Sequence, residues 1–231
     1  MMKTIGLIGG LTWYSTLDYY RLLNELVNKE LGGSHAAKII LNSVDFGEIK
    51  VLTEKQDWDG IALVICEAAK IIETAGAGCL MIGANTMHKI ADEVQAAVSI
   101  PVIHITDALA AVIKSKGLKK VALLGTKYTM QMDFYKNKLA AQGIAVIIPN
   151  EEDIEFINKS IYNEFAKGVF LPDRKQQYLQ IINSLIEQGG EGIILGCTEI
   201  PILIKQEDCA VPVFDTAFIH AEAAVKFAIK R

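Results

Sequence analysis

Several features that would define a common class of protein are missing from this sequence. It has a net charge of −4 and no basic run with aromatic residues interleaved, which argues against nucleic-acid binding. No apolar run approaches the roughly 18 residues that a membrane-spanning helix needs. The opening residues, MMKTIGLIGG, lack the apolar region and small-residue cleavage site of a signal peptide. These absences predict a cytoplasmic protein with no nucleic-acid or membrane partner.

Cofactor signatures are missing as well. The sequence has four cysteines: Cys66, Cys79, Cys197 and Cys209. Their spacing includes no CxxC or CxxxC pair, so it indicates neither a zinc site nor a disulfide framework. Gly9 and Gly10 are followed by LTWYST and do not form the GxGxxG fingerprint of dinucleotide binding. We interpret Gly10 instead as part of a turn where the backbone approaches a small ligand.

Short apolar runs alternate with segments of helical periodicity along the 231 residues. A buried strand is expected at 4–10, followed by a helix that begins near Ser15 or Thr16 and ends at Gly32. Further strands are expected over 37–46, 77–85 and 100–108, helices over 58–76 and 89–98, and a strand–helix–strand unit over 117–149. Strands separated by helices predict an α/β fold with parallel sheets covered on both faces.

Three pairs of segments repeat along the chain in the same order. KTIGLIGG resembles KKVALLGT, MIGANTMHKI resembles ILGCTEIPIL, and IPVIHITDALAAV resembles VPVFDTAFIHAEAAV. Nearly constant offsets of 116, 113 and 111 residues separate the equivalent positions Gly9 and Gly125, Gly83 and Gly196, and Pro101 and Pro212. The pattern predicts a tandem duplication. The alternative, that parallel strands merely look alike, stays open.

The duplication predicts two halves related by a pseudo-twofold axis. The expected halves are residues 1–98 with 211–231, and residues 99–210. Ligands of open α/β sheets bind beyond the carboxyl ends of the strands. Ala84 and Cys197, which follow Gly83 and Gly196 at such ends, are therefore expected to face one another across a cleft between the halves.

Cys197 is the strongest candidate for chemistry. It follows an apolar strand and precedes TEIPIL, in which Pro201 suits the first turn of a helix. Backbone N–H groups at a helix start favour the thiolate, so we expect a lowered pKa for this thiol. Cys66 and Cys79, inside apolar segments, are interpreted as small buried hydrophobic residues.

The NTMH segment offers Asn85, Thr86 and His88 at a strand-to-helix turn. Asn and Thr can cap a helix there or bind a carboxylate, and the two roles can coexist. His88 is either an orienting residue or a surface residue. Glu199, two residues after Cys197, either steers a base or complements the helix dipole.

Motifs along the whole chain resemble one family. GLIGGLTWYST, NSVDF, GANTMH, LLGTKYTM, GCTEI and PVFDTAFIHAEAAV are together similar to the aspartate/glutamate racemase family, and more narrowly to its broad-specificity amino-acid racemases. The resemblance implies two flavodoxin-like halves with the substrate in the cleft between them. It also implies no pyridoxal phosphate, no metal and a homodimer.

The resemblance further implies roles for individual residues. In the family two residues on opposite faces of the α-carbon exchange its proton, and Cys197 matches one of them. The other position, usually Cys and sometimes Thr in the broad-specificity branch, is Ala84 here. Asn85, Thr86 and Thr198 match positions that hold the α-carboxylate, and Lys167 matches a cation for the side-chain carboxylate. The predicted substrate-binding residues are Gly10, Asn85, Thr86, Thr126, Lys167, Thr198 and Glu199.

Ala84 is a departure from the family pattern, because a methyl group has no proton to give or accept. Three explanations stay open. The chain is an active-site variant of a racemase, or another group such as His88 or a water replaces the missing donor. Alternatively, it is a one-thiol decarboxylase or isomerase, or a non-catalytic protein that binds amino acids or dicarboxylates. The sequence predicts a cofactor-independent racemase whose activity Ala84 impairs.

Overall fold

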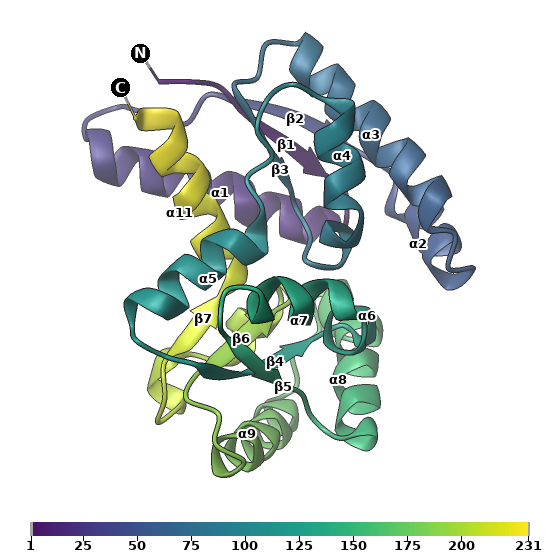
Figure 1. The fold of residues 1–231 in the computed structure, drawn as a ribbon, viewed down its shortest axis with the longest axis vertical. Helices are drawn as coiled ribbons and strands as arrows, with labels where there is room; N and C mark the ends of the chain where they lie inside the picture. Colours follow the sequence, from purple (N-terminus) through teal and green to yellow (C-terminus); the bar gives the residue numbers. More distant parts are fainter. Residues whose placement is uncertain (1, 231) are drawn as a thin grey trace. The chain divides into compact units, whose positions relative to one another are not determined.

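The computed structural model describes residues 2–230, which divide into two compact units (Figure 1). The first unit contains the chain up to His104 together with the segment from His220 onward, and the second unit is Ile105–Ile219. The chain therefore changes unit a few residues later than the expected boundaries at 98 and 210.

The first unit is built on a parallel sheet with the order β2-β1-β3. Its strands are β1 (Ile5–Gly9), β2 (Ile39–Ser43) and β3 (Cys79–Ile82). All of β1 and β3 is buried, as expected for strands covered on both faces. One further bridge, from Leu80 to Val102, continues the sheet beyond β3.

Helices cover both faces of this sheet. They are α1 (Trp13–Leu31), α2 (Phe46–Glu54), α3 (Trp58–Thr74), the 3₁₀ helix η1 (Thr86–Ile90), α4 (Ala91–Ala97) and the end of α11 (Thr216–Ile229). Figure 1 shows α3 and α1 on opposite sides of the strands. Because neighbouring residues of a strand point to opposite faces, Ile8 packs in the cluster with α3 while Gly9 lies against Thr16 of α1.

The second unit has a parallel sheet with the order β5-β4-β6-β7. Its strands are β4 (Lys120–Gly125), β5 (Ala145–Ile147), β6 (Ile193–Gly196) and β7 (Val213–Asp215). Its helices are α5 (Ile105–Ser115), α6 (Lys127–Gln131), α7 (Asp133–Ala140), α8 (Glu151–Asn163), η2 (Phe165–Lys167), α9 (Pro172–Glu187), α10 (Ile200–Leu203), η3 (Gln206–Asp208) and the start of α11.

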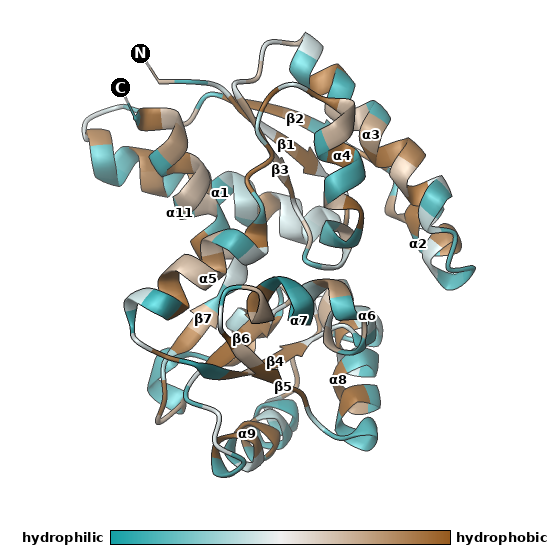
Figure 2. Ribbon diagram, viewed as in Figure 1, coloured by the Kyte–Doolittle hydropathy of each residue, from teal (hydrophilic) through white to brown (hydrophobic). Residues whose placement is uncertain are grey.

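The core of the second unit lies between this sheet and its helices. Tyr135, Phe165, Tyr178 and Phe214 are its largest buried side chains. Figure 2 shows the strands as predominantly hydrophobic, whereas the exposed helices α8 and α9 carry hydrophilic and hydrophobic residues in alternation. This is the pattern of helices that bury one face against a sheet.

The α/β fold with two parallel-sheet halves is confirmed, with three differences in detail. Helix α1 is capped by Thr12, whose side chain accepts from the Ser15 N–H, and not by Ser15 or Thr16. The strand expected over 100–108 is reduced to the Val102 bridge because α5 already begins at Ile105. Helices α2, α8 and α9 were not predicted.

Within residues 2–230, no helix combines the length and the apolar character needed to cross a bilayer.

Candidate functional site

Two turns at the carboxyl ends of β3 and β6 hold most of the predicted site residues. We call residues 83–88 the Gly83 turn and residues 196–200 the Gly196 turn. A Cβ atom on Gly83 would lie 2.9 Å from the Ile8 carbonyl oxygen, and one on Gly196 would lie 2.9 Å from that of Leu124. Each turn therefore needs glycine because it packs directly on the backbone of the central strand of its own sheet.

Cys197 in the Gly196 turn is hydrogen-bonded to a buried carboxylate. Its Sγ donates to Oε2 of Glu199 at 2.8 Å, and Oγ1 of Thr198 donates to the same oxygen at 2.8 Å. Glu199 is only 4% exposed and Thr198 is also buried, whereas Cys197 is partly exposed. The thiol and the neighbouring hydroxyl thus both donate hydrogen bonds to the same carboxylate oxygen.

The electrostatic environment of Cys197 keeps it a thiol. Burial raises its pKa well above the ordinary value, and the charge of Glu199 and the hydrogen bond to it raise the pKa further. The backbone N–H groups of Glu199 and Thr198 act in the opposite direction. The expected lowering of this pKa is therefore wrong. The helix-start effect is present, but burial and one negative charge outweigh it.

The Gly83 turn is polar and almost completely buried. Asn85, Thr86 and His88 are all less than 9% exposed, and Ala84 is half-buried. Asn85 stands at the N-cap of η1 but makes no side-chain capping hydrogen bond, so the structure does not support the capping alternative. His88 is not a surface residue. Its Nδ1 lies 2.9 Å from the Ala84 carbonyl, which can only accept, so His88 donates and fixes the turn.

A histidine cluster surrounds His88 in the first unit. Its ring contacts the rings of His104 and His220 edge-on, at centroid distances of 4.7 and 5.4 Å. Nε2 of His220 donates to the Ile103 carbonyl at 2.6 Å, and Nδ1 therefore accepts from the Tyr19 hydroxyl at 3.0 Å. Full burial lowers the pKa of His220 to about 4, so the ring is neutral at pH 7.

The sequence analysis did not predict this cluster, although the small number of histidines in the chain was a possible signal. Three of the only four histidines in the chain take part in it. His220 lies in the PVFDTAFIHAEAAV motif, but its partner Tyr19 is 201 residues away in the chain.

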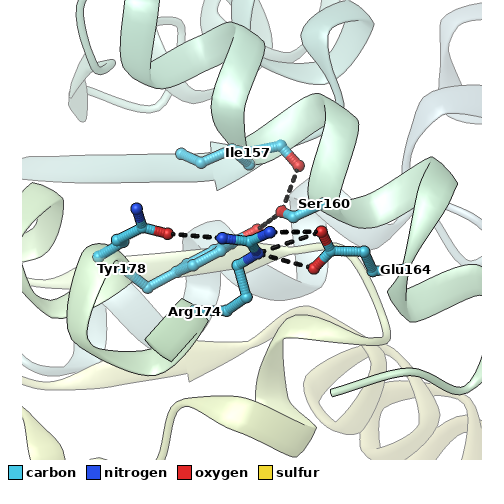
Figure 3. Close-up of polar contacts among 6 residues, drawn as sticks. Ile157, Ser160, Glu164, Arg174 and Tyr178 are labelled. Atoms are coloured by element: carbon cyan, nitrogen blue, oxygen red, sulfur yellow. Dashed lines mark hydrogen bonds and ion pairs between the residues drawn. The ribbon is translucent and has the colours of Figure 1, made fainter. Parts of the chain in front are cut away.

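A second network lies inside the unit that holds Cys197. The Tyr178 hydroxyl donates to Ser160 Oγ at 2.7 Å, because Ser160 gives its own proton to the Ile157 carbonyl at 2.8 Å (Figure 3). Burial raises the pKa of Tyr178, and the charges of Cys197, Glu164 and Glu199 contribute in the same direction. Tyr178 therefore lies within electrostatic range of the thiol and its carboxylate. Nothing in the local sequence around Tyr178 predicts this position.

Lys167 ends the short helix η2 and is exposed. Among residues 2–230 it forms no ion pair, in contrast to Arg174 in the same region. Arg174 forms a bidentate salt bridge with Glu164, in which Nε and Nη2 each lie 2.8 Å from a carboxylate oxygen (Figure 3). Lys167 is thus a cation whose charge is not neutralised by a neighbour in the described chain.

Thr126 and Gly10 are explained by local packing. Thr126 caps α6 by accepting from the Thr129 N–H at 3.2 Å. Gly10 has a φ of +79°, and a Cβ there would lie 2.0 Å from the Val44 carbonyl oxygen. The close approach that Gly10 permits is therefore to the chain's own backbone, and neither residue's contacts test the predicted role in substrate binding.

Residues 2–230 contain no group of three or more His, Cys, Asp or Glu side chains arranged to hold a metal ion.

The profile of the Asp/Glu/Hydantoin racemase family matches residues 8–224, and the chain therefore belongs to this family. The resemblance inferred from the motifs is confirmed. Family membership supports an amino-acid racemase, that is, an isomerase that acts on small amino-acid substrates.

Individual relatives span the whole chain. A crystal structure of a candidate Asp/Glu racemase from Yersinia pestis is 47% identical, with a TM-score of 0.93 over 99% of this chain and 100% of its own. An aspartate racemase homologue from Pyrococcus horikoshii OT3 is 39% identical, with a TM-score of 0.88 over 99% and 100%. The broad specificity amino-acid racemase RacX of Bacillus subtilis (strain 168) is 23% identical over 96% of both chains.

Proposed function

We propose that this protein is a cofactor-independent racemase of aspartate, glutamate or a broader set of amino acids, with Cys197 as one acid/base. The observation that carries the proposal is the Cys197 thiol at the end of β6, hydrogen-bonded to buried Glu199 in a chain of the racemase family. Proton removal without a cofactor requires a group in contact with the proton and preorganised donors for the developing charge. The Gly196 turn offers such a group.

The substrate carboxylates are proposed to bind at the polar residues of the two turns and at Lys167. Asn85 and Thr86 support this role because they are buried at the end of β3 and Asn85 is not used as a cap. Lys167 supports an acidic side chain because its charge has no counter-ion in the described chain. The Thr198 hydroxyl already donates to Glu199, so we assign to Thr198 a role in orienting that carboxylate.

Ala84 leaves the second acid/base position without a titratable group, and we propose that it impairs racemisation. Of the two groups considered as replacements, His88 is the poorer donor. Its Nδ1 proton is already held by the Ala84 carbonyl, which favours an orienting role. A water molecule remains the proposed substitute on that side of the substrate.

Ala84 also supports a second candidate function. A chain with one proton-transfer group suits a protein that binds an amino acid or dicarboxylate without turnover, or a one-thiol decarboxylase or isomerase. Tight binding with no exchange of the α-hydrogen would favour the first of these. Release of carbon dioxide from a malonate-type acid would favour the second.

The test is α-hydrogen exchange in heavy water with both enantiomers of aspartate, glutamate and a neutral panel, followed by mass spectrometry and chiral chromatography. We expect one enantiomer to exchange its α-hydrogen faster than the centre inverts. The reason is that only one face of the substrate is proposed to have a side chain, Cys197, that can transfer a proton. Equal exchange of both enantiomers with full inversion would reject the one-sided site. The homodimer stays a prediction, which analytical ultracentrifugation tests.

A further inference from the structure

We propose that the Glu164–Arg174 salt bridge is a clamp that positions Lys167 and so sets the preference of the site for an acidic side chain. The proposal deepens the proposed function and rests on it, because Lys167 is there the cation for the side-chain carboxylate. Glu164 and Arg174 act through the loop that carries Lys167 and do not contact the substrate, so they are positioning residues.

Residues 164–171 form a loop between α8 and α9 that is hydrogen-bonded back to its first residue. The backbone carbonyl of Glu164 accepts from the N–H of Lys167 at 2.9 Å and from the N–H of Val169 at 3.0 Å. Gly168, with a φ of +75°, provides the left-handed residue at which η2 ends. A fixed Glu164 therefore also fixes the backbone of Lys167.

Arg174 holds Glu164 from the first turn of α9. Its Nε and Nη2 atoms donate to the two carboxylate oxygens of Glu164, each at 2.8 Å (Figure 3). Nη1 donates to Gln177 at 3.1 Å, and the guanidinium lies 5.7 Å from the centroid of the Phe156 ring. The two charged side chains are only 26% and 21% exposed. A bidentate pair in this setting fixes one geometry, because the planar guanidinium matches the carboxylate at two points.

The loop is anchored in the same packed region as the thiol. Phe165 is 1% exposed, and its ring lies 5.8 Å from the ring of Tyr178. Both aromatic residues belong to the buried cluster against which Cys197 packs. Burial raises the pKa of Tyr178, and the charges of Cys197 and Glu164 add to the rise. The start of the loop and the thiol therefore lie on either side of one buried tyrosine, within electrostatic range of it.

Lys167 depends on this anchoring because its own side chain is exposed. A lysine ammonium is a point charge on a flexible stem, so its position follows the backbone that carries it. Loss of the clamp would leave the charge of Lys167 intact but would spread it over more positions. The affinity for a substrate with a carboxylate side chain should then fall, while the affinity for a neutral substrate should not change.

Two other roles for the salt bridge give different results. If Arg174 itself bound the substrate carboxylate, Glu164→Gln would release the guanidinium and tighten the binding of acids. If the salt bridge only stabilised the fold, its loss would affect acidic and neutral substrates alike. The substitution Glu164→Gln therefore separates the three roles, since the amide keeps the size of the side chain and removes its charge.

The test compares aspartate with asparagine, its neutral isostere. We would measure α-hydrogen exchange in heavy water as a function of substrate concentration, and equilibrium binding by calorimetry. The variants are Glu164→Gln, Arg174→Lys, Lys167→Gln and the double variant of Glu164→Gln with Lys167→Gln. Lys175→Gln is the matched control, because it removes a neighbouring ion pair of α9, the 2.8 Å contact with Asp208, and leaves the loop untouched.

We expect Glu164→Gln to raise the KM and the Kd of aspartate by about 3–30-fold, the usual range of coupling between interacting residues. The exchange rate at saturating aspartate should stay within about threefold, because Cys197 is unchanged. Lys167→Gln should weaken aspartate by about 10–100-fold, as expected for one hydrogen bond between charged groups. The double variant should bind aspartate no more weakly than Lys167→Gln alone, because the clamp acts only through Lys167.

The remaining variants should follow the same logic. Arg174→Lys keeps the charge but loses the second prong of the salt bridge, so its KM for aspartate should lie between those of the unmodified protein and Glu164→Gln. Asparagine should bind equally to all the proteins, and Lys175→Gln should behave as the unmodified protein does. If asparagine binds too weakly to measure, the double variant still distinguishes a clamp from a structural salt bridge.

Two results would overturn the proposal. One is unchanged or tighter binding of aspartate by the Glu164→Gln protein, and the other is a loss in the double variant beyond that of Lys167→Gln. If the Glu164→Gln protein folds poorly, Arg174→Lys, alone and combined with Lys167→Gln, carries the same comparison. If the unmodified protein exchanges the α-hydrogen of no amino acid, the proposed function fails, and the calorimetric binding of aspartate still decides whether the clamp positions Lys167.

Discussion

The two units share one backbone plan and carry different chemistry. Each has a central strand, β1 or β4, with β2 or β5 on one side and, on the other side, β3 or β6, the strand that leads into the glycine turn. The Val102 bridge in the first unit occupies the place of β7 in the second, beyond β3 and β6 respectively. Even the contact that requires glycine is the same, since Ile8 and Leu124 occupy equivalent positions in the two central strands.

The side chains around the two turns differ completely. The Gly83 turn has Ala84 and His88. His88 is hydrogen-bonded to a backbone carbonyl, and its ring packs against the rings of two other histidines. The Gly196 turn has a thiol, a buried carboxylate and a tyrosine within electrostatic range. The shared backbone plan sets where each turn stands, while the residues after the glycine decide whether the turn holds a group that can move a proton.

Restoring a proton-transfer group to the Gly83 turn should produce the largest effect. Ala84→Cys or Ala84→Thr is expected to raise the rate of racemisation by about 10²–10⁴-fold, since this is the usual contribution of a positioned acid or base. Chiral chromatography of aspartate and glutamate incubated with each protein measures the change.

Ala84→Val is the matched control, because it adds volume without a transferable proton and should give no gain. The double variant Ala84→Cys with Cys197→Ala should lose the gain, since only one face of the substrate would again be served. No gain from either Cys or Thr would show that the difference between the turns is not what limits racemisation.

Much of the fold was predictable because its signals are local. Apolar runs such as TIGLIGG and GIILG mark buried parallel strands wherever they occur, and the repeat of Gly83 and Gly196 follows from a backbone contact. Helices α2 and α8 were missed although they have capping residues, Asp45 and Asn150. Helix α2 is short and mostly exposed, whereas α8 carries Ile154, Ile157 and Ile161 at helical spacing, so its apolar periodicity was a usable signal.

The candidate site was predictable in position but not in its electrostatics. The place of Cys197 after a strand is visible in GCTEI, yet the direction of its pKa shift depends on burial and on how the Glu199 side chain turns back. The histidine cluster depends on contacts between segments more than 100 residues apart, such as His220 with Ile103. Sequence spacing carries no information about such contacts.

Acid should weaken the first unit through His220. In the unfolded chain a histidine has a pKa of about 6.5, and burial lowers that of His220 to about 4. Between these values the unfolded chain binds more protons, so the stabilisation is complete above pH 6.5 and is lost as the pH falls toward 4. The expected loss is on the order of 3 kcal/mol. Hydrogen exchange of peptides from the first unit, measured from pH 7 to pH 4 and corrected for intrinsic rates, gives the change.

The second unit is the internal reference, because its described residues include no histidine. His220→Gln should flatten the acid dependence of the first unit while lowering its stability at pH 7, where the bonds to Tyr19 and Ile103 are lost. His88 packs against both His220 and His104, so a dependence that survives in His220→Gln would assign the acid sensitivity to these neighbouring histidines.

The smallest change is expected from replacing Gly83 or Gly196, which tests whether the contacts of these two glycines with the central strands are equivalent. Gly83→Ala and Gly196→Ala each place a Cβ 2.9 Å from a carbonyl oxygen of the central strand, so the strand or the turn must shift. We expect each to cost about 1–3 kcal/mol of the free energy of unfolding, as overpacking of a tight core does, with similar values in the two units. Urea denaturation followed by hydrogen exchange in each unit measures the loss. Gly78→Ala is the control, since the three atoms nearest to its Cβ all belong to the Lys3 side chain, at 3.1 Å or more, and none is a carbonyl oxygen of the central strand. A loss at one turn without a loss at the other would mean that the shared contact is not what preserves glycine in both, and that the similarity of the two units does not extend to the packing of the turns.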